Sequence, residues 1–219
     1  MNHYIPSRTK AVLFDFDDTL VGTIEACWAL DKYVAHTWYD KDLTDAELQA
    51  NWHLPLREMI PIIFGIESAS VDQALERIID CYPKYPKKLF PSVIPVLQAL
   101  QAANIPVGVV SSTVRKTLEY DLGVFQLNDL IAYLQTQEDT PYHKPDSRVF
   151  DPASHWLKQL GVEKGDGVLY IGDGLHDMKA ANAAGFHFIG VETGLVDANG
   201  FKEAGATSIH DLSILLADL

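Results

Sequence analysis

The sequence predicts an α/β protein with a doubly wound parallel sheet, Rossmann-like and three-layered, that carries an inserted all-helical segment. Two observations predict the sheet: short apolar runs each end in a polar or glycine-containing turn, and helical patterns lie between these runs. A third observation predicts the insertion, because residues 22–90 contain no convincing strand.

Four apolar runs are the main predicted strands. They are rich in Val, Ile and Phe without strict alternation, which is typical of strands buried on both faces of a parallel sheet. The runs are KAVLFDFDDT, IPVGVVSST, GVLYIGDG and FHFIGVETG, at residues 10–19, 105–113, 167–174 and 186–194. Weaker strand signals follow in LIAYLQ, from Leu130, and in TSIH near the C-terminus.

The segments between these strands have the periodicity of helices packed on a sheet. Apolar residues recur every three or four positions over 93–100, 150–160 and 178–184. Gly161 and Gly185 follow the last two segments and suit the left-handed residue that ends many helices. Alternation of strand and helix therefore favours the doubly wound sheet.

The inserted segment begins with a long predicted helix over residues 24–38. Its apolar side chains fall on one face, with Asp31 as the exception, and Trp28 and Trp38 are expected in the core. Three further helices and a linker rich in Pro and Lys complete the segment, at 44–51, 55–64, 70–82 and 82–91.

The domain boundaries follow from this pattern. We expect an α/β core formed by residues 1–21 and 91–219, and a helical domain formed by residues 22–90. The sequence leaves the choice between a monomer and a homodimer open.

The composition excludes several functional classes. Asp and Glu number 30 against 17 Lys and Arg, a net charge of −13, so no nucleic acid polymer is expected as a partner. No apolar stretch approaches the roughly 20 residues of a membrane helix. Two cysteines without a disulfide or metal pattern, and no recognisable secretion signal, favour a cytoplasmic location.

The stretch FDFDDTL places three carboxylates at the end of the first predicted strand. Asp15, flanked by Phe14 and Phe16, is costly to keep charged without a partner. Carboxyl ends of parallel strands meet at one edge of a sheet, so we expect the polar residues that follow three strands to converge there. They are Asp15, Asp17, Asp18, Ser111, Ser112, Thr113, Asp173 and Asp177.

A divalent cation would offset this charge. Mg²⁺ prefers oxygen ligands and commonly takes one or two carboxylates together with substrate phosphate oxygens. Asp15 and Asp173 are the candidate pair, with Asp177 in support. The ion would neutralise a phosphate and align it for attack by a carboxylate. Each residue taken alone fits equally a helix cap or a turn.

Four motifs then occur in a recognisable order: DFDDT, VGVVS, the KP of YHKPDSRVF, and GDGLHD. On these motifs the chain resembles the haloacid dehalogenase-like phosphatases, specifically members of the phosphoglycolate phosphatase type with a helical cap. The resemblance implies that the inserted segment is the cap domain and that Mg²⁺ is the cofactor.

The resemblance also implies roles for the carboxylates. Asp15 is expected to be the nucleophile that forms an aspartyl-phosphate, and also a metal ligand. Asp17 is expected to protonate the leaving oxygen and then to activate water, while its backbone carbonyl reaches the metal. Asp173 and Asp177 are expected to complete the metal site.

Two phosphate ligands are implied as well. Ser111 would hydrogen-bond the transferring phosphoryl group and Lys144 would neutralise it, although a lysine taken alone is more often a solvated surface residue. Ser112 is the alternative to Ser111, which we prefer because it is the first polar residue after the strand. Asp18 and Gly22 depart from the family pattern of Gly and Asp, and we expect Asp18 to face solvent or the cap hinge.

The implied activity is Mg²⁺-dependent hydrolysis of a small organic phosphate monoester, such as a phosphoglycolate-like compound, a sugar phosphate or a nucleotide monophosphate. The presence of Asp17 argues against a dehalogenase or a phosphonatase. A phosphomutase of the β-phosphoglucomutase type remains an alternative, although Cys27 stands where such enzymes carry a His. A non-catalytic metal- and phosphate-binding protein is another. Arg57 is a candidate contact for an anionic substrate group or an exposed surface arginine.

Overall fold

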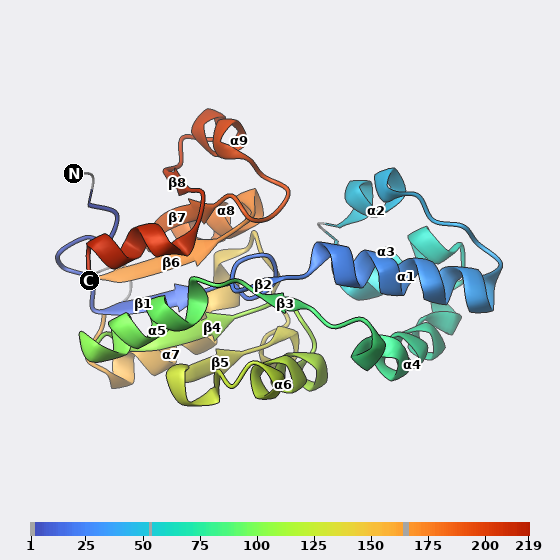
Figure 1. Cartoon of the computed structure of the whole chain (residues 1–219), viewed down its shortest axis with the longest axis horizontal. Coiled ribbons are helices and arrows are strands. Elements are labelled where there is room, and N and C mark those ends of the chain that lie inside the picture. The colour runs from blue at the N-terminus through green and yellow to red at the C-terminus, as the bar shows by residue number, and fades with distance from the viewer. Residues whose placement is uncertain (1–2, 53, 164–166) are drawn as a thin grey trace. The chain divides into compact units, whose positions relative to one another are not determined.

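The computed structural model describes residues 3–52, 54–163 and 167–219, and the chain forms two compact units. One unit comprises Met1–Gly22 and Leu89–Leu219 and is built of strands and helices (Figure 1). The other comprises Thr23–Lys88 and is helical.

A six-stranded parallel sheet forms the centre of the α/β unit, with strand order β5-β4-β1-β6-β7-β8. The predicted doubly wound parallel sheet is therefore confirmed, and the four strong apolar runs supply its four middle strands. The six strands are β1 (Ala11–Phe14), β4 (Val107–Val110), β5 (Tyr133–Gln135), β6 (Val168–Gly172), β7 (His187–Val191) and β8 (Ser208–Ile209).

Helices cover both faces of the sheet and produce three layers (Figure 1). Alternate residues of β1 enter opposite layers, Val12 and Phe14 on one side, Ala11 and Leu13 on the other. Each large apolar side chain buried in this way contributes about 2 kcal/mol. The first layer contains α5 (Val93–Ala102), α6 (Arg115–Val124) and the 3₁₀ helix η6 (Leu212–Ala217), and the second contains α7 (Asp151–Gln159), α8 (Leu175–Ala184) and α9 (Ala198–Glu203).

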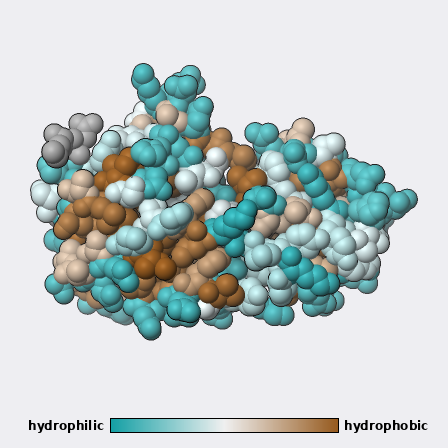
Figure 2. Space-filling view, in the orientation of Figure 1, coloured by the Kyte–Doolittle hydropathy of each residue, from teal (hydrophilic) through white to brown (hydrophobic). Residues whose placement is uncertain are grey.

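The outer surface of the first layer is partly apolar. Figure 2 shows hydrophobic residues gathered on the visible face of the α/β unit over α5 and η6. Leu216 of η6 and the C-terminal Leu219 are 40% and 37% exposed.

Among the helices of the described ranges, none is both long and apolar enough to cross a lipid bilayer. Short 3₁₀ turns complete this unit: η3 (Asn128–Leu130), η4 (Gln137–Asp139) and η5 (Ser147–Phe150).

The strand order reverses at β1, which lies between β4 and β6. The chain runs from β1 to β4 and β5 on one side, and then to β6, β7 and β8 on the other. Phe14, the last residue of β1, is in register with Val109 and Ile171. The carboxyl ends of β1, β4 and β6 therefore meet at the switch point where ligands bind in such sheets.

The described residues of the helical unit form four α-helices, which agree with the predicted helices to within one or two residues. Thr44 begins the second of them with a capping box, in which its hydroxyl accepts from the Glu47 N–H and the Glu47 carboxylate accepts from the Thr44 N–H. The elements are α1 (Ile24–Tyr39), α2 (Asp45–Asn51), α3 (Leu56–Phe64), η1 (Ser68–Ser70), α4 (Val71–Cys81) and η2 (Tyr82–Lys84).

A two-stranded sheet joins the segments by which the chain leaves and re-enters the α/β unit. It pairs β2 (Val21–Gly22) with β3 (Lys88–Leu89). The expectation of no strand over 22–90 is wrong in this detail, because strands of two residues are too short to show an apolar pattern.

The buried face of α1 agrees with the predicted one at Asp31, Val34 and Ala35 but not at Trp38. Trp38, expected in the core, keeps 40% exposure and lies 5.5 Å from the Arg77 guanidinium. Asp31, the one polar residue on the predicted face, is buried with it, at 4% exposure. Packing against the other helices of the unit decides which side chains of α1 are buried, and the apolar periodicity alone does not. The buried residues are Leu30, Asp31, Val34 and Ala35.

Burial raises the pKa of Asp31 from 3.8 to about 7, and no hydrogen bond or ion pair of Asp31 exists among the described residues. The unfolded chain loses this proton near pH 4, whereas the folded chain keeps it to about pH 7. Stability therefore falls as pH rises through this window, by about 4 kcal/mol in total.

The substitution Asp31→Asn tests this assignment. We expect the free energy of unfolding of the variant, relative to wild type, to increase between pH 4 and pH 7 by up to about 4 kcal/mol and then to stay constant. Urea denaturation at several pH values measures it. Asp80→Asn, on the exposed face of α4, is the control. A difference that does not change with pH would contradict the assignment.

Candidate active site

Asp15 is the first residue after β1 and is 7% exposed. Its backbone N–H donates to the Ile171 carbonyl at 2.8 Å, which continues the ladder between β1 and β6 beyond the strand. Two residues later, Asp17 is partly exposed. The sheet therefore fixes the backbone from which the first candidate carboxylates project.

Lys144 lies between two of the predicted carboxylates. Its Nζ is 3.0 Å from Asp15 Oδ1 and 2.7 Å from Asp177 Oδ1, and its side chain is 1% exposed. The ring of Tyr170 on β6 lies 5.3 Å from the ammonium. Lys144 is thus a buried, paired cation, unlike the solvated surface lysine that its position alone would suggest.

Three carboxylates form a compact acidic cluster at the same edge. One oxygen from each of Asp15, Asp173 and Asp177 lies within 4.8 Å of the others. Asp177 enters the cluster from the first turn of α8, where its Oδ2 accepts from the Gly174 N–H at 3.0 Å. Gly172 leaves the room for this arrangement, since a Cβ there would lie 2.7 Å from the Asp177 carboxyl.

Burial and mutual repulsion perturb these groups. Burial raises the pKa of Asp15 to about 7 despite the opposing Lys144 charge. Burial, together with Asp177 and Asp15, raises the pKa of Asp173 well above 3.8. For Asp177 the effect of burial is outweighed by Lys144, which lowers the pKa. For Lys144, in turn, burial is outweighed by its two partners, and its pKa is raised.

The cluster fits a hard divalent cation. Its donors are carboxylate oxygens, which Mg²⁺ prefers, and a cation there would counteract the burial and the mutual repulsion that raise the pKa of Asp15 and Asp173. Predicted metal ligands from two separate segments, the loop after β1 and the β6–α8 connection, are brought together, and Asp17 lies two residues after Asp15 in the first of these.

The loop after β4 supplies the hydroxyl groups. Ser111 is 5% exposed, and its Oγ accepts from the Thr113 N–H at 3.1 Å. Ser112 is exposed. The Thr113 hydroxyl donates to Asp17 Oδ2 in a short hydrogen bond. The sequence pattern places Thr113 among the polar residues of this strand end but indicates no role for it.

The loop after β7 also approaches the cluster, and sequence reasoning assigned nothing to it. A Cβ at Gly194 would lie 1.9 Å from Asp173 Oδ2, so only glycine fits against that carboxylate. The hydroxyl of Thr193 donates to the Asp18 carbonyl at 2.5 Å. The available signal was that FHFIGVETG also ends in a polar, glycine-containing turn.

The expectation that Asp18 faces solvent or the cap hinge is wrong on exposure, because the residue is 2% exposed. Its φ of 52° lies in the left-handed region, which Gly, Asn and Asp adopt most readily. The turn closes with a hydrogen bond from the Asp18 N–H to the Val21 carbonyl at 2.7 Å. A residue that tolerates positive φ is therefore required at this position.

Arg57 belongs to the helical unit and lies on its surface. Its guanidinium is 2.8 Å from Asp72 Oδ1, and the two side chains are 61% and 79% exposed. Such exposed ion pairs contribute little to stability. Nothing in its contacts indicates a ligand, and its contact with substrate stays a prediction.

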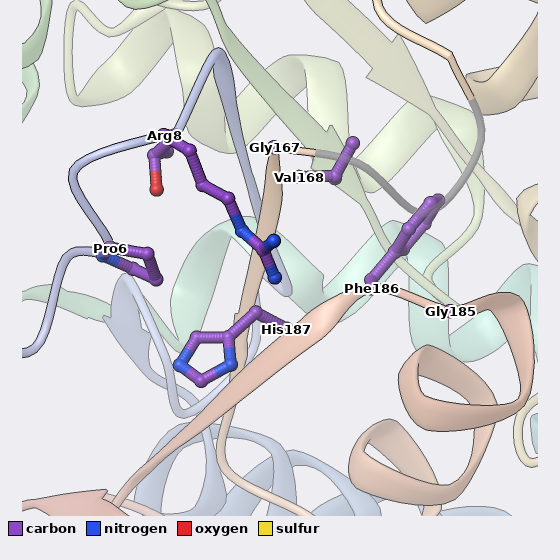
Figure 3. A pocket seen from close by; sticks show the side chains of 8 residues that line it. Pro6, Arg8, Gly167, Val168, Gly185, Phe186 and His187 are labelled. Atoms are coloured by element: carbon purple, nitrogen blue, oxygen red, sulfur yellow. The ribbon is translucent and has the colours of Figure 1, made fainter.

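A cavity of about 190 Å³ lies at the opposite end of the sheet, where β6 and β7 begin (Figure 3). Arg8 and His187 line it, and burial together with the Arg8 charge lowers the pKa of His187. It contains none of the predicted site residues. The predicted groups lie instead at the carboxyl edge of the sheet, at the opposite end of the strands.

The structure defines a doubly wound α/β protein whose switch point holds an acidic cluster, a buried lysine and strand-end hydroxyls. The model of the haloacid dehalogenase-like hydrolase family matches residues 12–191. The chain belongs to this family.

Individual proteins resemble the chain along nearly its whole length. The protein PpaX of Clostridium perfringens is 28% identical over 220 residues, covering 96% of each chain. The pyrophosphatase PpaX of Bacillus pumilus is 25% identical over 219 residues, also covering 96% of each. The crystal structure of a haloacid dehalogenase-like hydrolase from Bacteroides fragilis superposes with a TM-score of 0.81, at 28% identity, covering 94% of this chain and 99% of that one.

Metal binding is testable without a substrate. We expect Mg²⁺ to raise the melting temperature by several degrees, equivalent to about 1–3 kcal/mol at saturating metal. Asp173→Asn is expected to abolish the increase while folding at least as stably as wild type in EDTA, since the metal-free site disfavours its charge. Asp129→Asn, at an exposed acid, is the control. An undiminished increase in the Asp173 variant would exclude this site.

Proposed function

We propose that the protein is a Mg²⁺-dependent phosphatase that hydrolyses small organic phosphate monoesters through an aspartyl-phosphate on Asp15. The observation that carries the proposal is the ion pair of Lys144 with Asp15, at 3.0 Å, within the acidic cluster of the switch point. Membership of a hydrolase family supports it, and so do the names of the PpaX relatives.

In the first step a carboxylate oxygen of Asp15 forms a bond to phosphorus, and the bond from phosphorus to the leaving oxygen breaks. Asp17 gives its proton to that oxygen. Lys144 neutralises charge on the phosphoryl group. The Ser111 oxygen accepts from the Thr113 N–H through a lone pair, so its own O–H serves as a donor to a phosphoryl oxygen.

In the second step Asp17 removes a proton from water. The water oxygen forms a bond to phosphorus, and the bond from phosphorus to Asp15 breaks, which releases inorganic phosphate. Asp15, Asp173, Asp177 and the Asp17 carbonyl would hold the Mg²⁺ ion, which supplies positive charge beside the phosphate oxygens when bound.

A phosphoanhydride is the second candidate substrate, because two relatives bear the name of a pyrophosphatase. The phosphomutase alternative requires a phosphate acceptor other than water, and Cys27 on α1 stands where the expected His would be. The non-catalytic alternative would be favoured by the loss of Asp15 or Asp17, and both are present.

A substrate panel tests the function. Phosphoglycolate, sugar phosphates, nucleotide monophosphates and inorganic pyrophosphate are incubated with Mg²⁺ or with EDTA, and released phosphate is measured. We expect release that EDTA abolishes and that Asp15→Asn reduces by on the order of 10³-fold or more. Asp129→Asn is the matched control. Activity that survives in the Asp15 variant would remove the nucleophile from the mechanism, and an inactive wild type across the panel would favour the non-catalytic alternative.

Arg57→Ala tests whether this arginine contributes to substrate choice. Because Arg57 is exposed and paired with Asp72, we expect KM to be unchanged across the panel. Unequal changes in KM among substrates would instead show that the side chain contacts an anionic group.

A further inference from the structure

Thr113 connects the loops that follow two neighbouring strands. It lies three residues beyond the end of β4, and its Oγ1 donates a short hydrogen bond to Oδ2 of Asp17, which follows β1. β1 and β4 are adjacent in the sheet. The hydroxyl therefore contacts the carboxyl group assigned to proton transfer, although no family motif singled out the residue.

The backbone of Thr113 is held at both ends. Its N–H donates to Ser111 Oγ at 3.1 Å, and its carbonyl accepts from the Gln137 N–H at 3.3 Å. Thr113 is also half-buried, which limits the rotation of its side chain. A fixed backbone and a β-branched side chain leave the hydroxyl little freedom, so its position is set before any ligand arrives.

We propose that Thr113 is a positioning residue that orients the carboxyl group of Asp17 for proton transfer. The proposal rests on the proposed phosphatase function. A protonated carboxyl group carries one proton, and an oxygen that accepts a hydrogen bond from Thr113 is the acceptor oxygen of that group. With Thr113 donating to Oδ2, the proposal assigns the Asp17 proton to Oδ1 and makes Oδ1 the atom that passes it to the leaving oxygen.

This assignment keeps the reaction balanced. In the first step the O–H bond at Oδ1 breaks and the proton passes to the leaving oxygen as that oxygen separates from phosphorus. In the second step Oδ1 takes a proton from the attacking water. Thr113 keeps its own proton in both steps and serves to hold Oδ2.

The dependence on leaving group separates this role from a purely structural one. An alkoxide leaving group needs a proton in the transition state, whereas p-nitrophenolate leaves readily without one. A misplaced Asp17 should therefore slow an alkyl phosphate more than p-nitrophenyl phosphate. General loosening of the loop would slow both substrates equally.

The experiment compares Thr113→Val, Thr113→Ser and Thr117→Val. Thr117 is the matched control, since it is 6% exposed and its hydroxyl donates to a backbone carbonyl, that of Val114, at 3.0 Å. Steady-state kcat and KM are measured with p-nitrophenyl phosphate and with the most active alkyl phosphate of the panel.

We expect Thr113→Val to lower kcat about 100-fold on the alkyl phosphate and less than about 10-fold on p-nitrophenyl phosphate, with KM changed less than about 3-fold. Thr113→Ser should restore kcat to within a few fold, and Thr117→Val should match wild type. Equal losses on both substrates, no loss, or no rescue by Ser would overturn the role of Thr113 while the phosphatase function stands. A wild type that cleaves neither substrate would overturn the proposed function itself.

Discussion

The arrangement of the candidate site depends on one buried cation. Lys144 binds a carboxylate from the end of β1 and another from the first turn of α8, two segments more than a hundred residues apart in the sequence. Two buried carboxylates this close would repel each other, and an unpaired buried charge is strongly destabilising. The ammonium group converts that repulsion into an attraction, and it thereby fixes where the loop before η5 must lie.

The single positive charge of Lys144 does not neutralise all the carboxylates of the site. The cluster contains Asp15, Asp173 and Asp177, with Asp17 and Asp18 in the turn that follows Asp15, and most of these side chains are buried. Such a site repels a phosphate dianion until more positive charge is present. In the proposed mechanism the binding of the cation and of the substrate is therefore coupled, because the positive charge of one neutralises the negative charge of the other.

Much of this could be predicted from the sequence, for a definite physical reason. Strands buried on both faces are continuously apolar, so their ends are marked sharply by the first polar residues, such as Asp15, Ser111 and Asp173. Lys144 has no such signal around it, and only the order of motifs indicated its importance. Convergence at one edge then followed from the parallel sheet.

The remaining features depend on contacts between distant segments. Asp31 and Trp38 lie on the same helix, and periodicity alone cannot decide which of them the neighbouring helices cover. Thr113 acquires its significance from Asp17, and Gly194 from Asp173, which in each case lies on another strand end. A sequence pattern describes one segment at a time and does not show contacts between residues of distant segments.

The turn at Asp18 has a consequence for how this loop can change during evolution. The Thr193 hydroxyl donates to the carbonyl of residue 18, and the N–H of residue 18 donates to the Val21 carbonyl. Residue 18 therefore takes part in both connections through its backbone alone. The identity of the side chain is therefore irrelevant to the link between the β1 and β7 loops, provided that the residue accepts a left-handed conformation. Gly, Asn and Asp are therefore equivalent for this link, so an aspartate at position 18 leaves both connections in place.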